Sequence, residues 1–482
     1  KVNYVHFSKL GGYAKLQTLV CKASGESWTD DDRLNFASFY TMFSQQFHAL
    51  GGEELDLTPG DALLVYLSVY RYSDTYDATP AQVRQNLEKL WNEVKVLTEP
   101  HGVELSLDPP KSPAEPLLSK LNIFSPSKQP CELRVVFLHE YNAKISAWVR
   151  AHDEGRDALA KVFPDKVYIS CYEDVNPEVD AEQILEEVAH NNADVVFATS
   201  VRMYNACLKV AAQHPKTRIL NCSLNAPHPL VRTYYPRTYE VTYLLGMLAG
   251  IMTKTGHIGY VAANPVYGVP AAINAFAQGL KSVRPAGLIW LRWACQTDAA
   301  HPLDFADCPD IDRVYARDSR EPADTHRDYG LCRKLPDGSL QPLGLPIWRW
   351  DTFYVEIVRS IFDGSWDNAA TTRAVNYWWG LRSGAEDLEY QESLPSGTRQ
   401  LLDLMETLQG SDNVHIFPEK LYDNEDNLHS PENRVYSPKE LMEMDWLDAC
   451  VHGKLPHYDE LDVKTRTVLA INGLDNVKGL EK

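Results

Sequence analysis

The segment AWVRAHDEGRDAL at residues 147–159 decides the fold, together with the apolar run LRVVFLH that precedes it at residues 133–139. A short, continuous apolar run is typical of a strand that a parallel sheet buries on both faces. The amphipathic segment that follows predicts a helix, and strand-like runs then recur as DKVYIS, ADVVFATS and TRILNCS with helical segments between them. This alternation predicts a doubly wound α/β lobe.

A second lobe is predicted to begin near Tyr239. A helix should extend to Met252, followed by the strand HIGYVAA at residues 257–263, a helix at residues 270–283 and the strand GLIWLRW at residues 287–293. We therefore expect two doubly wound lobes. Open parallel sheets bind ligands at the carboxyl ends of their strands, so the residues directly after each strand are the candidates for a site.

The rest of the chain adds an amino-terminal module, a return crossover and a carboxyl-terminal extension. The amino-terminal part contains helix-like blocks and ends in a segment rich in proline and serine, which is typical of a linker. The predicted parts are a mostly helical module with its linker at residues 1–125, lobe 1 at 132–238, lobe 2 at 239–345, a crossover back to lobe 1 at 346–380 and an extension at 381–482.

Charge and hydropathy exclude two classes of partner. The chain carries 66 acidic and 47 basic residues, a formal net charge of −19, whereas nucleic-acid binding usually requires a basic patch on a basic domain. The chain also lacks a run of about 18 apolar residues, which a membrane helix needs. We expect neither a nucleic-acid partner nor a membrane span.

Nine cysteines are scattered without a C-x-x-C pair, which is typical of a reducing compartment. Cys295, His301, Cys308 and Cys332 are not spaced as the ligands of a zinc knuckle are, so we predict no metal, and we expect no cofactor. The sequence begins with neither a secretory signal nor a lipobox cysteine. A cytoplasmic location is favoured, and an extracytoplasmic lipoprotein is the alternative if a signal has been removed upstream.

The segments predicted to follow the strands combine polar and aromatic residues: HEYNAKISAW, ATSVRMYN, NCSLNAPHP, ANPVYG and PIWRWDTFY. A planar heterocycle needs flat aromatic surfaces and hydrogen-bonding groups at its edge, and an asparagine amide can address adenine N6 and N7 together. Each aromatic residue also has a competing interpretation as part of the core. The predicted ligand-binding residues are Glu140, Tyr141, Trp148, Ser200, Asn205, Asn225, Tyr267, Asn274, Trp348 and Trp350.

Five blocks resemble signatures of the basic membrane protein family of periplasmic-type purine and nucleoside binding proteins. Residues 147–159 are similar to its W-t-y-a-H-d-x-G-r motif, and residues 273–285 (INAFAQGLKSVRP) are similar to its N-A-F-x-x-G-x-x-x-V-n-P helix. Several ordered blocks at the spacing of a family are more specific than one short motif. The other blocks lie at residues 239–255, 256–261 and 346–366.

The resemblance implies a flytrap like the type I periplasmic binding proteins, in which two lobes close on a purine base or nucleoside. It implies that Trp148 stacks on the base, that Asn274 recognises the base edge from lobe 2, and that Trp350 lies at the return crossover. Glu140 and Tyr141 occupy the first strand-end loop, where the family places an acidic ligand contact. The G-x-D that contacts ribose in nucleoside-specific members is missing, which favours a free base such as adenine.

The sequence contains no G-x-S-x-G elbow, G-x-G-x-x-G, Walker loop or H-E-x-x-H motif, so we predict a binding protein and not an enzyme. The favoured hypothesis is a cytoplasmic purine sensor, because the extension resembles that of unexported, multi-domain relatives with an additional upstream domain. The first alternative is the substrate-binding protein of a purine or nucleoside ABC permease. The second is an interaction scaffold without a ligand.

Overall fold

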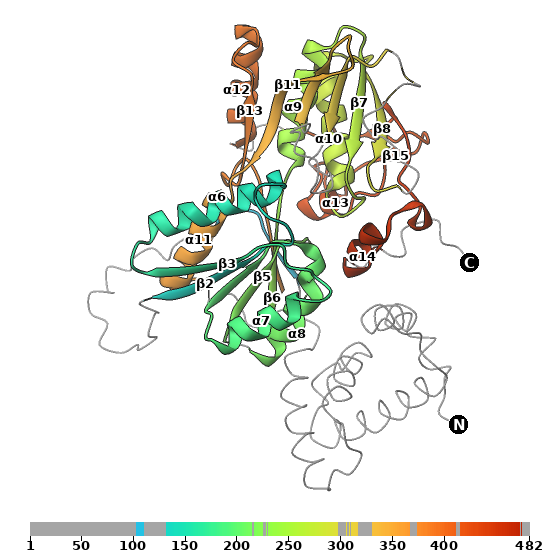
Figure 1. The fold of residues 1–482 in the computed structure, drawn as a ribbon. Helices are drawn as coiled ribbons and strands as arrows, with labels where there is room; N and C mark the ends of the chain where they lie inside the picture. The colour runs from blue at the N-terminus through green and yellow to red at the C-terminus, as the bar shows by residue number, and fades with distance from the viewer. Residues whose placement is uncertain are drawn as a thin grey trace, which may run out of the picture.

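The computed structural model shows two α/β lobes, each built on a seven-stranded sheet (Figure 1). The helical module predicted for residues 1–125 lies outside the described residues, except for residues 103–109. The structure describes residues 103–109, 132–214, 216–224, 228, 230–296, 305, 308, 310–316, 330–366, 374–410, 415–472 and 474.

Lobe 1 has a fully parallel sheet. Its strands are β1 (Val103–Ser106), β2 (Leu133–Leu138), β3 (Val167–Tyr172), β4 (Val195–Ala198), β5 (Arg218–Asn221), β6 (Val231–Pro236) and β12 (Ala374–Trp379), in the order β1-β12-β6-β5-β4-β2-β3. Helices α6 (Ala147–Val162) and α11 (Trp350–Phe362) pack on one face, and α7 (Ala181–His190) and α8 (Tyr204–Gln213) pack on the other. The alternation of strand and helix predicted for this lobe is present.

Strand β1 joins lobe 1 from residues that the sequence assigned to the amino-terminal module. It pairs in parallel with β12, so that Val103 lies opposite Ala374 and Ser106 opposite Tyr377. A strand of four residues carries little periodicity of its own, because strand preference depends on the neighbouring strands. Only the pairing with a strand far along the chain defines this edge of the sheet.

Lobe 2 has a mixed sheet. Its strands are β7 (His257–Ala262), β8 (Leu288–Trp293), β9 (Arg313–Ala316), β10 (Gly330–Lys334), β11 (Leu340–Trp348), β13 (Glu386–Tyr390) and β16 (Val451–His452), in the order β13-β11-β10-β9-β7-β8-β16. Strands β9, β7, β8 and β16 pair in parallel. Strand β10 pairs antiparallel with β9 and with β11, and β11 pairs antiparallel with β13. Helices α9 (Tyr239–Met252) and α10 (Val269–Val283) pack on the sheet and on each other.

The carboxyl-terminal extension is part of lobe 2. It supplies β13 and β16, which form the two edges of the sheet. Helix α12 (Ser396–Gly410) contacts α9, and α13 (Pro438–Met442) contacts α10. The remaining elements of the extension are β14 (Leu421–Tyr422), β15 (Leu428–His429), η4 (Tyr458–Glu460) and α14 (Val463–Ile471).

Glycines allow two helix pairs to approach closely. A Cβ on Gly246 of α9 would lie 2.1 Å from the carbonyl oxygen of Phe276, and one on Gly279 of α10 would lie 2.0 Å from that of Tyr243. A Cβ on Gly155 of α6 would lie 2.8 Å from the backbone of α11. The glycine of the segment at residues 147–159 is therefore a packing residue, because any side chain there would separate the two helices.

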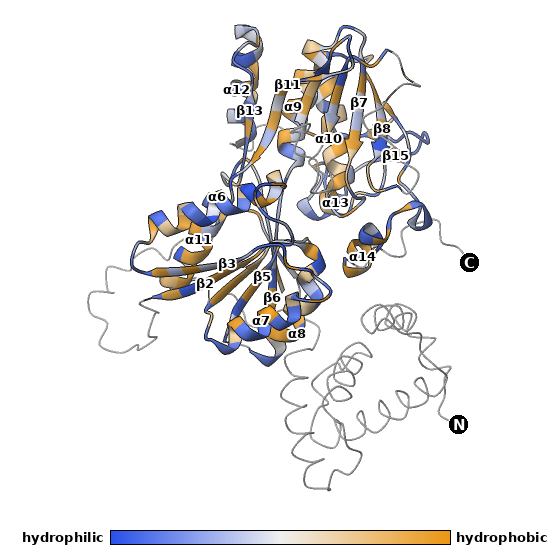
Figure 2. Cartoon of the chain, viewed as in Figure 1, coloured by the Kyte–Doolittle hydropathy of each residue, from blue (hydrophilic) through white to orange (hydrophobic). Residues whose placement is uncertain are grey.

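Apolar residues are concentrated in the strands of both lobes and in α9 and α10 (Figure 2). Residues 239–250 of α9 are all buried, as expected for a helix enclosed between a sheet and other helices. None of the described helices combines the length and the apolarity that crossing a bilayer requires.

Candidate functional site

An aromatic cluster lies where the two lobes join. Trp148 stands in the first turn of α6, which Ser146 caps with its side chain. The Trp148 ring meets Trp348 edge to face with centroids 5.0 Å apart, meets Trp350 at 5.4 Å and lies 5.9 Å from Tyr235. Trp348 is the last residue of β11 in lobe 2, so the cluster contains side chains from both lobes. We call these four residues the aromatic cluster.

The cluster rests on a buried polar layer. The His152 ring stacks on Trp350 with centroids 4.4 Å apart, and its Nδ1 lies 2.6 Å from the hydroxyl of Tyr354. Burial lowers the pKa of His152, with a smaller contribution from His139, so the ring stays neutral. Trp350 is 3% exposed and belongs to the lobe 1 core. Trp148 is only partly buried. Of Trp148 and Trp350, Trp148 is therefore the one with accessible aromatic surface.

A charged network occupies the loops after β2 and β4. The Ser200 hydroxyl donates to Glu140 Oε2 at 2.6 Å, and Arg202 donates to Glu140 Oε1 and to Glu178 at 2.9 Å. Burial raises the pKa of the Tyr141 hydroxyl, and the neighbouring Glu140 raises it further. The structure therefore brings three predicted residues, Glu140, Tyr141 and Ser200, together at one end of the sheet.

Two polar atoms at the end of β5 lack a hydrogen-bond partner within the described part of the chain. They are Oδ1 of Asn221 and Oγ of Ser223, both buried. The Asn221 amide donates to the carbonyl of Ser200 at 2.9 Å, and the Trp148 indole donates to the carbonyl of Thr199 at 3.3 Å. Because these carbonyls belong to adjacent residues, the side chains of Trp148 and Asn221 lie close together. Buried polar groups normally find partners, so a ligand edge is a chemically suitable one.

His139 directly follows β2, and its side chain is neutral. Thr199 donates its hydroxyl hydrogen to the carbonyl of Leu138 at 3.0 Å, so its oxygen accepts from His139 Nδ1 at 2.8 Å. Burial, with a smaller contribution from Arg156, lowers the pKa of His139 from 6.5 to about 4. The imidazole is therefore uncharged at neutral pH, with its proton on Nδ1.

His139, Asp153 and Cys171 place potential ligand atoms within 4.8 Å of one another. However, the guanidinium of Arg156 lies 2.9 Å from Asp153 and hydrogen-bonds to Cys171. A fixed cation beside these groups opposes the binding of a metal ion. We therefore interpret the group as the partly buried binding partners of the Arg156 side chain.

The remaining predicted residues are dispersed. Asn274 is fully buried in α10, where its amide donates to the carbonyl of Trp446 at 2.9 Å and accepts from the amide of Asp448 at 2.8 Å. The Asn274 amide, which was predicted to recognise a base, is thus hydrogen-bonded to the carboxyl-terminal extension. Tyr267 is partly buried beside the lobe 2 core, Asn205 is exposed on α8, and Asn225 lies outside the described residues.

Sequence reasoning missed Asn221, Ser223, Thr199 and Tyr235 as members of this region. Thr199, Asn221 and Ser223 lie at the carboxyl ends of the predicted strands ADVVFATS and TRILNCS, so the rule that ligands bind at the carboxyl ends of strands could have found them. Tyr235 lies in β6, which the sequence analysis did not predict. The segment NCSLNAPHP contains two asparagines, and Asn225 was chosen over Asn221. No local signal distinguishes the two, because only the sheet shows that Asn221 is the last residue of β5.

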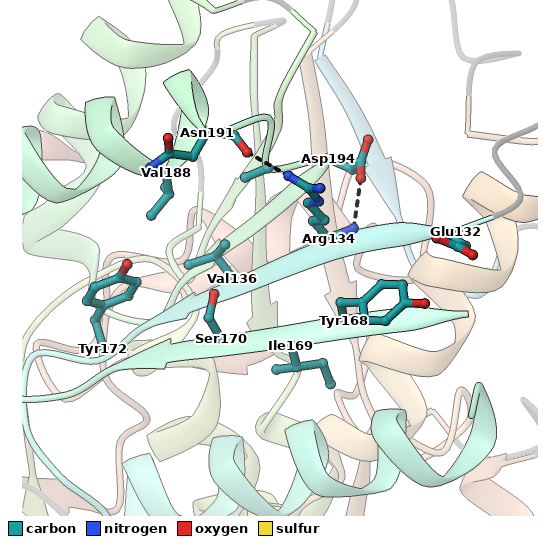
Figure 3. A pocket seen from close by; sticks show the side chains of 11 residues that line it. Glu132, Arg134, Val136, Tyr168, Ile169, Ser170, Tyr172, Val188, Asn191 and Asp194 are labelled. Carbon is teal, nitrogen blue, oxygen red and sulfur yellow. Dashed lines mark hydrogen bonds between the residues drawn. The ribbon is translucent and has the colours of Figure 1, made fainter. Parts of the chain in front are cut away.

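A separate hollow of about 610 Å³ lies beside the edge strand β3 (Figure 3). Arg134, at the amino-terminal half of β2, donates through its backbone to Asp194 at 2.7 Å and through its guanidinium to the carbonyl of Asn191 at 3.0 Å. These groups satisfy one another, and they lie toward the opposite end of the strands from the aromatic cluster. The hollow contains none of the predicted residues, so we do not assign the site to it.

Parts of the chain are similar to known binding proteins. Residues 134–300 match the family model described as ABC transporter substrate-binding protein PnrA-like. A purine-binding protein of Brucella abortus is 26% identical over 343 residues, covering 67% of this chain and 94% of that protein. A putative ABC transporter glucose-binding protein of Haloferax volcanii is 30% identical over 257 residues, covering 50% of this chain and 63% of that protein.

Two solved structures are similar to parts of this chain. One is an ABC transporter solute-binding protein from Conexibacter woesei, with a TM-score of 0.43, 14% identity and coverage of 58% of this chain and 97% of that one. The other is a transcriptional activator of the comK gene from Bacillus halodurans, with a TM-score of 0.45, 17% identity and coverage of 57% and 97%.

Proposed function

We propose that this chain binds a purine base or nucleoside between its lobes without catalysing a reaction, because residues 134–300 match the family model of PnrA-like ABC transporter substrate-binding proteins. The observation that carries the proposal is the position of a partly exposed aromatic ring next to buried polar atoms. Trp148 and Asn221 hydrogen-bond to the adjacent carbonyls of Thr199 and Ser200. A purine needs an aromatic surface for its face and hydrogen-bonding groups for its edge.

In this proposal each group has a defined task. Trp148 stacks on the base, held edge to face by Trp348 of lobe 2. Oδ1 of Asn221 accepts a hydrogen bond from an exocyclic amine or a ring N–H, and the Ser223 hydroxyl pairs with a ring nitrogen or a carbonyl. Adenine is the favoured ligand. The purine-binding relative from Brucella abortus supports this ligand class.

We further propose that the protein serves as the substrate-binding component of an ABC permease. This replaces the cytoplasmic sensor as the favoured hypothesis, because the matched family and the two relatives described above are named for binding a small molecule or for transport. The role requires an extracytoplasmic location. The gene sequence upstream of Lys1 would test it: a secretory signal with a lipobox cysteine supports transport, and a further domain supports sensing.

A cytoplasmic sensor is the second candidate because of the cysteines. Cys171, Cys207, Cys295 and Cys450 have free thiols, although exported proteins commonly contain disulfides.

Calorimetric titration with adenine, adenosine, guanosine and hypoxanthine tests the ligand class, and glucose serves as the alternative ligand. We expect one purine to bind the wild-type protein and the Trp148→Ala variant to lose that binding. The matched control is Trp290→Ala, because Trp290 stacks on His452 in lobe 2 with centroids 4.6 Å apart and does not belong to the aromatic cluster. Absence of binding to all four purines, or equal binding by Trp148→Ala, would contradict the proposal.

A further inference from the structure

Helix α14, near the carboxyl terminus, is anchored on lobe 2. The segment before it forms a bridge between Leu461 and Gln296, and the amide of Asp462 donates to the carbonyl of Cys295 at 2.8 Å. The Thr465 hydroxyl donates to Oδ1 of Asn264 at 3.0 Å. Asn264 follows β7, so the helix stands at the carboxyl ends of the lobe 2 strands.

The same helix contacts lobe 1. It packs on the short helix η3 (Val201–Met203), which follows β4. Ile471 packs against the lobe 1 core cluster that contains Met203. The Lys464 side chain hydrogen-bonds to the hydroxyl of Tyr141, in the loop after β2.

Two residues of α14 show that this helix lies between the lobes. Leu469 is 1% exposed and belongs to the lobe 2 core, whereas Ile471 packs on lobe 1. Residues two apart point to nearly opposite sides of an α-helix, because each residue turns the helix by about 100°. The helix is therefore held from both sides, between the strand ends that form the candidate site.

We propose that α14 is a third wall of the ligand site: a strap fixed on lobe 2 that docks on the strand ends of lobe 1 and holds the lobes together around the ligand. Ile471 and Lys464 are its positioning residues toward lobe 1. This inference rests on the proposed function for its ligand, but the docking of α14 on lobe 1 is measurable without one. It predicts that ligand release requires the strap to leave η3.

The first test measures the dissociation rate of adenine by stopped-flow tryptophan fluorescence. Ile471→Ala and Lys464→Ala should release adenine faster, by about tenfold for Ile471→Ala, because changes in affinity within one site appear mainly in the dissociation rate. The matched control is Val463→Ala on the same helix, since the Val463 side chain is 75% exposed. Dissociation rates equal to wild type in both test variants would overturn the proposal.

The second test follows hydrogen exchange in the protein without ligand. Exchange at η3 and in the loop after β2 should become faster in Ile471→Ala and Lys464→Ala and should stay unchanged in Val463→Ala. Unchanged exchange in both test variants would also overturn the strap. If the wild-type protein binds no purine, the proposed function fails, and the exchange result alone then decides whether α14 docks on lobe 1. Lys464 is exposed, so its variant remains informative if Ile471→Ala does not fold.

Discussion

Trp148 of lobe 1 and Trp348 of lobe 2 meet edge to face, with ring centroids 5.0 Å apart and planes inclined at 75°. This geometry is the favourable one for aromatic pairs, because the positive edge of one ring meets the negative face of the other. The ring proposed to stack on the ligand is thus positioned by the opposite lobe. A change in the angle between the lobes would alter the surface that Trp148 presents.

A double-mutant cycle on Trp148 and Trp348 should reveal this coupling. Removing both rings should cost less than the sum of the single Trp→Ala variants, by about 1 kcal/mol in the free energy of unfolding. Urea denaturation measures all four proteins. The control cycle pairs Trp148 with Trp290, for which we expect additivity within about 0.5 kcal/mol. Equal coupling in the two cycles would refute a direct interaction.

Stability should fall as the pH is lowered from 6.5 to about 4, partly because of His139. Burial lowers the pKa of His139 from 6.5 to about 4, so the unfolded chain takes up the proton first as the pH falls. The stability that the neutral His139 contributes is complete above pH 6.5 and is lost as the pH approaches 4. The loss in the free energy of unfolding is on the order of 3 kcal/mol. His152 acts in the same direction, since its pKa is also lowered by burial.

Urea denaturation at pH 7.5, 6 and 5 tests this pH dependence. The His139→Gln variant should lose less stability over this range than the wild-type protein. His190, which is exposed at the end of α7, provides the control, and His190→Gln should follow the wild-type profile. A wild-type profile for His139→Gln would show that the buried imidazole does not control acid stability.

A buried ion pair in the crossover from β6 to α9 also contacts the crossover after β12. Arg237 and Glu240 lie 2.9 Å apart, and Glu240 also accepts from the amide of Leu381 at 2.8 Å. Glu240→Gln would leave the guanidinium buried without a counter-charge, so we expect a loss of about 3–5 kcal/mol in the free energy of unfolding. Asp351→Asn breaks the exposed pair with Arg349 and should cost less than about 1 kcal/mol.

Chemical denaturation of both variants makes the comparison. Burial raises the pKa of Glu240, although Arg237 opposes the shift. The ion pair exists only while Glu240 is charged, so the stability loss of Glu240→Gln should be measured at a pH above the pKa of this carboxyl group. If Glu240→Gln and Asp351→Asn cost the same, the buried pair does not hold the crossovers together.

Gly279→Ala should be severely destabilising because α9 and α10 have no room for a methyl group between them. The added Cβ would lie 2.0 Å from the carbonyl oxygen of Tyr243, and relief requires a shift of the helix backbone that costs about 1–3 kcal/mol or more. Gly397→Ala in α12 is the matched control, because a Cβ there meets no atom within 4 Å. It should be neutral or stabilising by up to about 1 kcal/mol. Thermal unfolding followed by circular dichroism distinguishes the two, and a similar midpoint for both variants would contradict the packing argument.

Much of the fold was predictable because it depends on local patterns. Apolar runs marked β2, β3, β4 and β5 of lobe 1, and helical periodicity marked α6, α9 and α10, as the structure confirms. Strands β1, β6 and β12 were not predicted. The antiparallel half of the lobe 2 sheet was not predicted, since β10 and β11 carry only partial burial patterns. Pairing partners far apart in the chain are set by tertiary contacts, which a local pattern does not contain.

The candidate site was only partly predictable for the same reason. A family motif selected Trp148, and its place after a predicted strand selected Glu140. Their roles toward a ligand stay predictions. A motif also selected Asn274, but the structure commits its amide to Trp446 and Asp448 of the extension. An asparagine presents the same donors and acceptors wherever it occurs, and only its neighbours decide which group they bind.

The sequence by itself determined the alternating strands and helices and the two-lobed class, because burial periodicity acts along the chain. Only the tertiary structure decided that β1 and β16 complete the two sheets, that Trp148 meets Trp348 across the lobes, and that α14 stands between them. These arrangements join segments distant in sequence. Their free energy comes from surfaces that exist only after the lobes have folded.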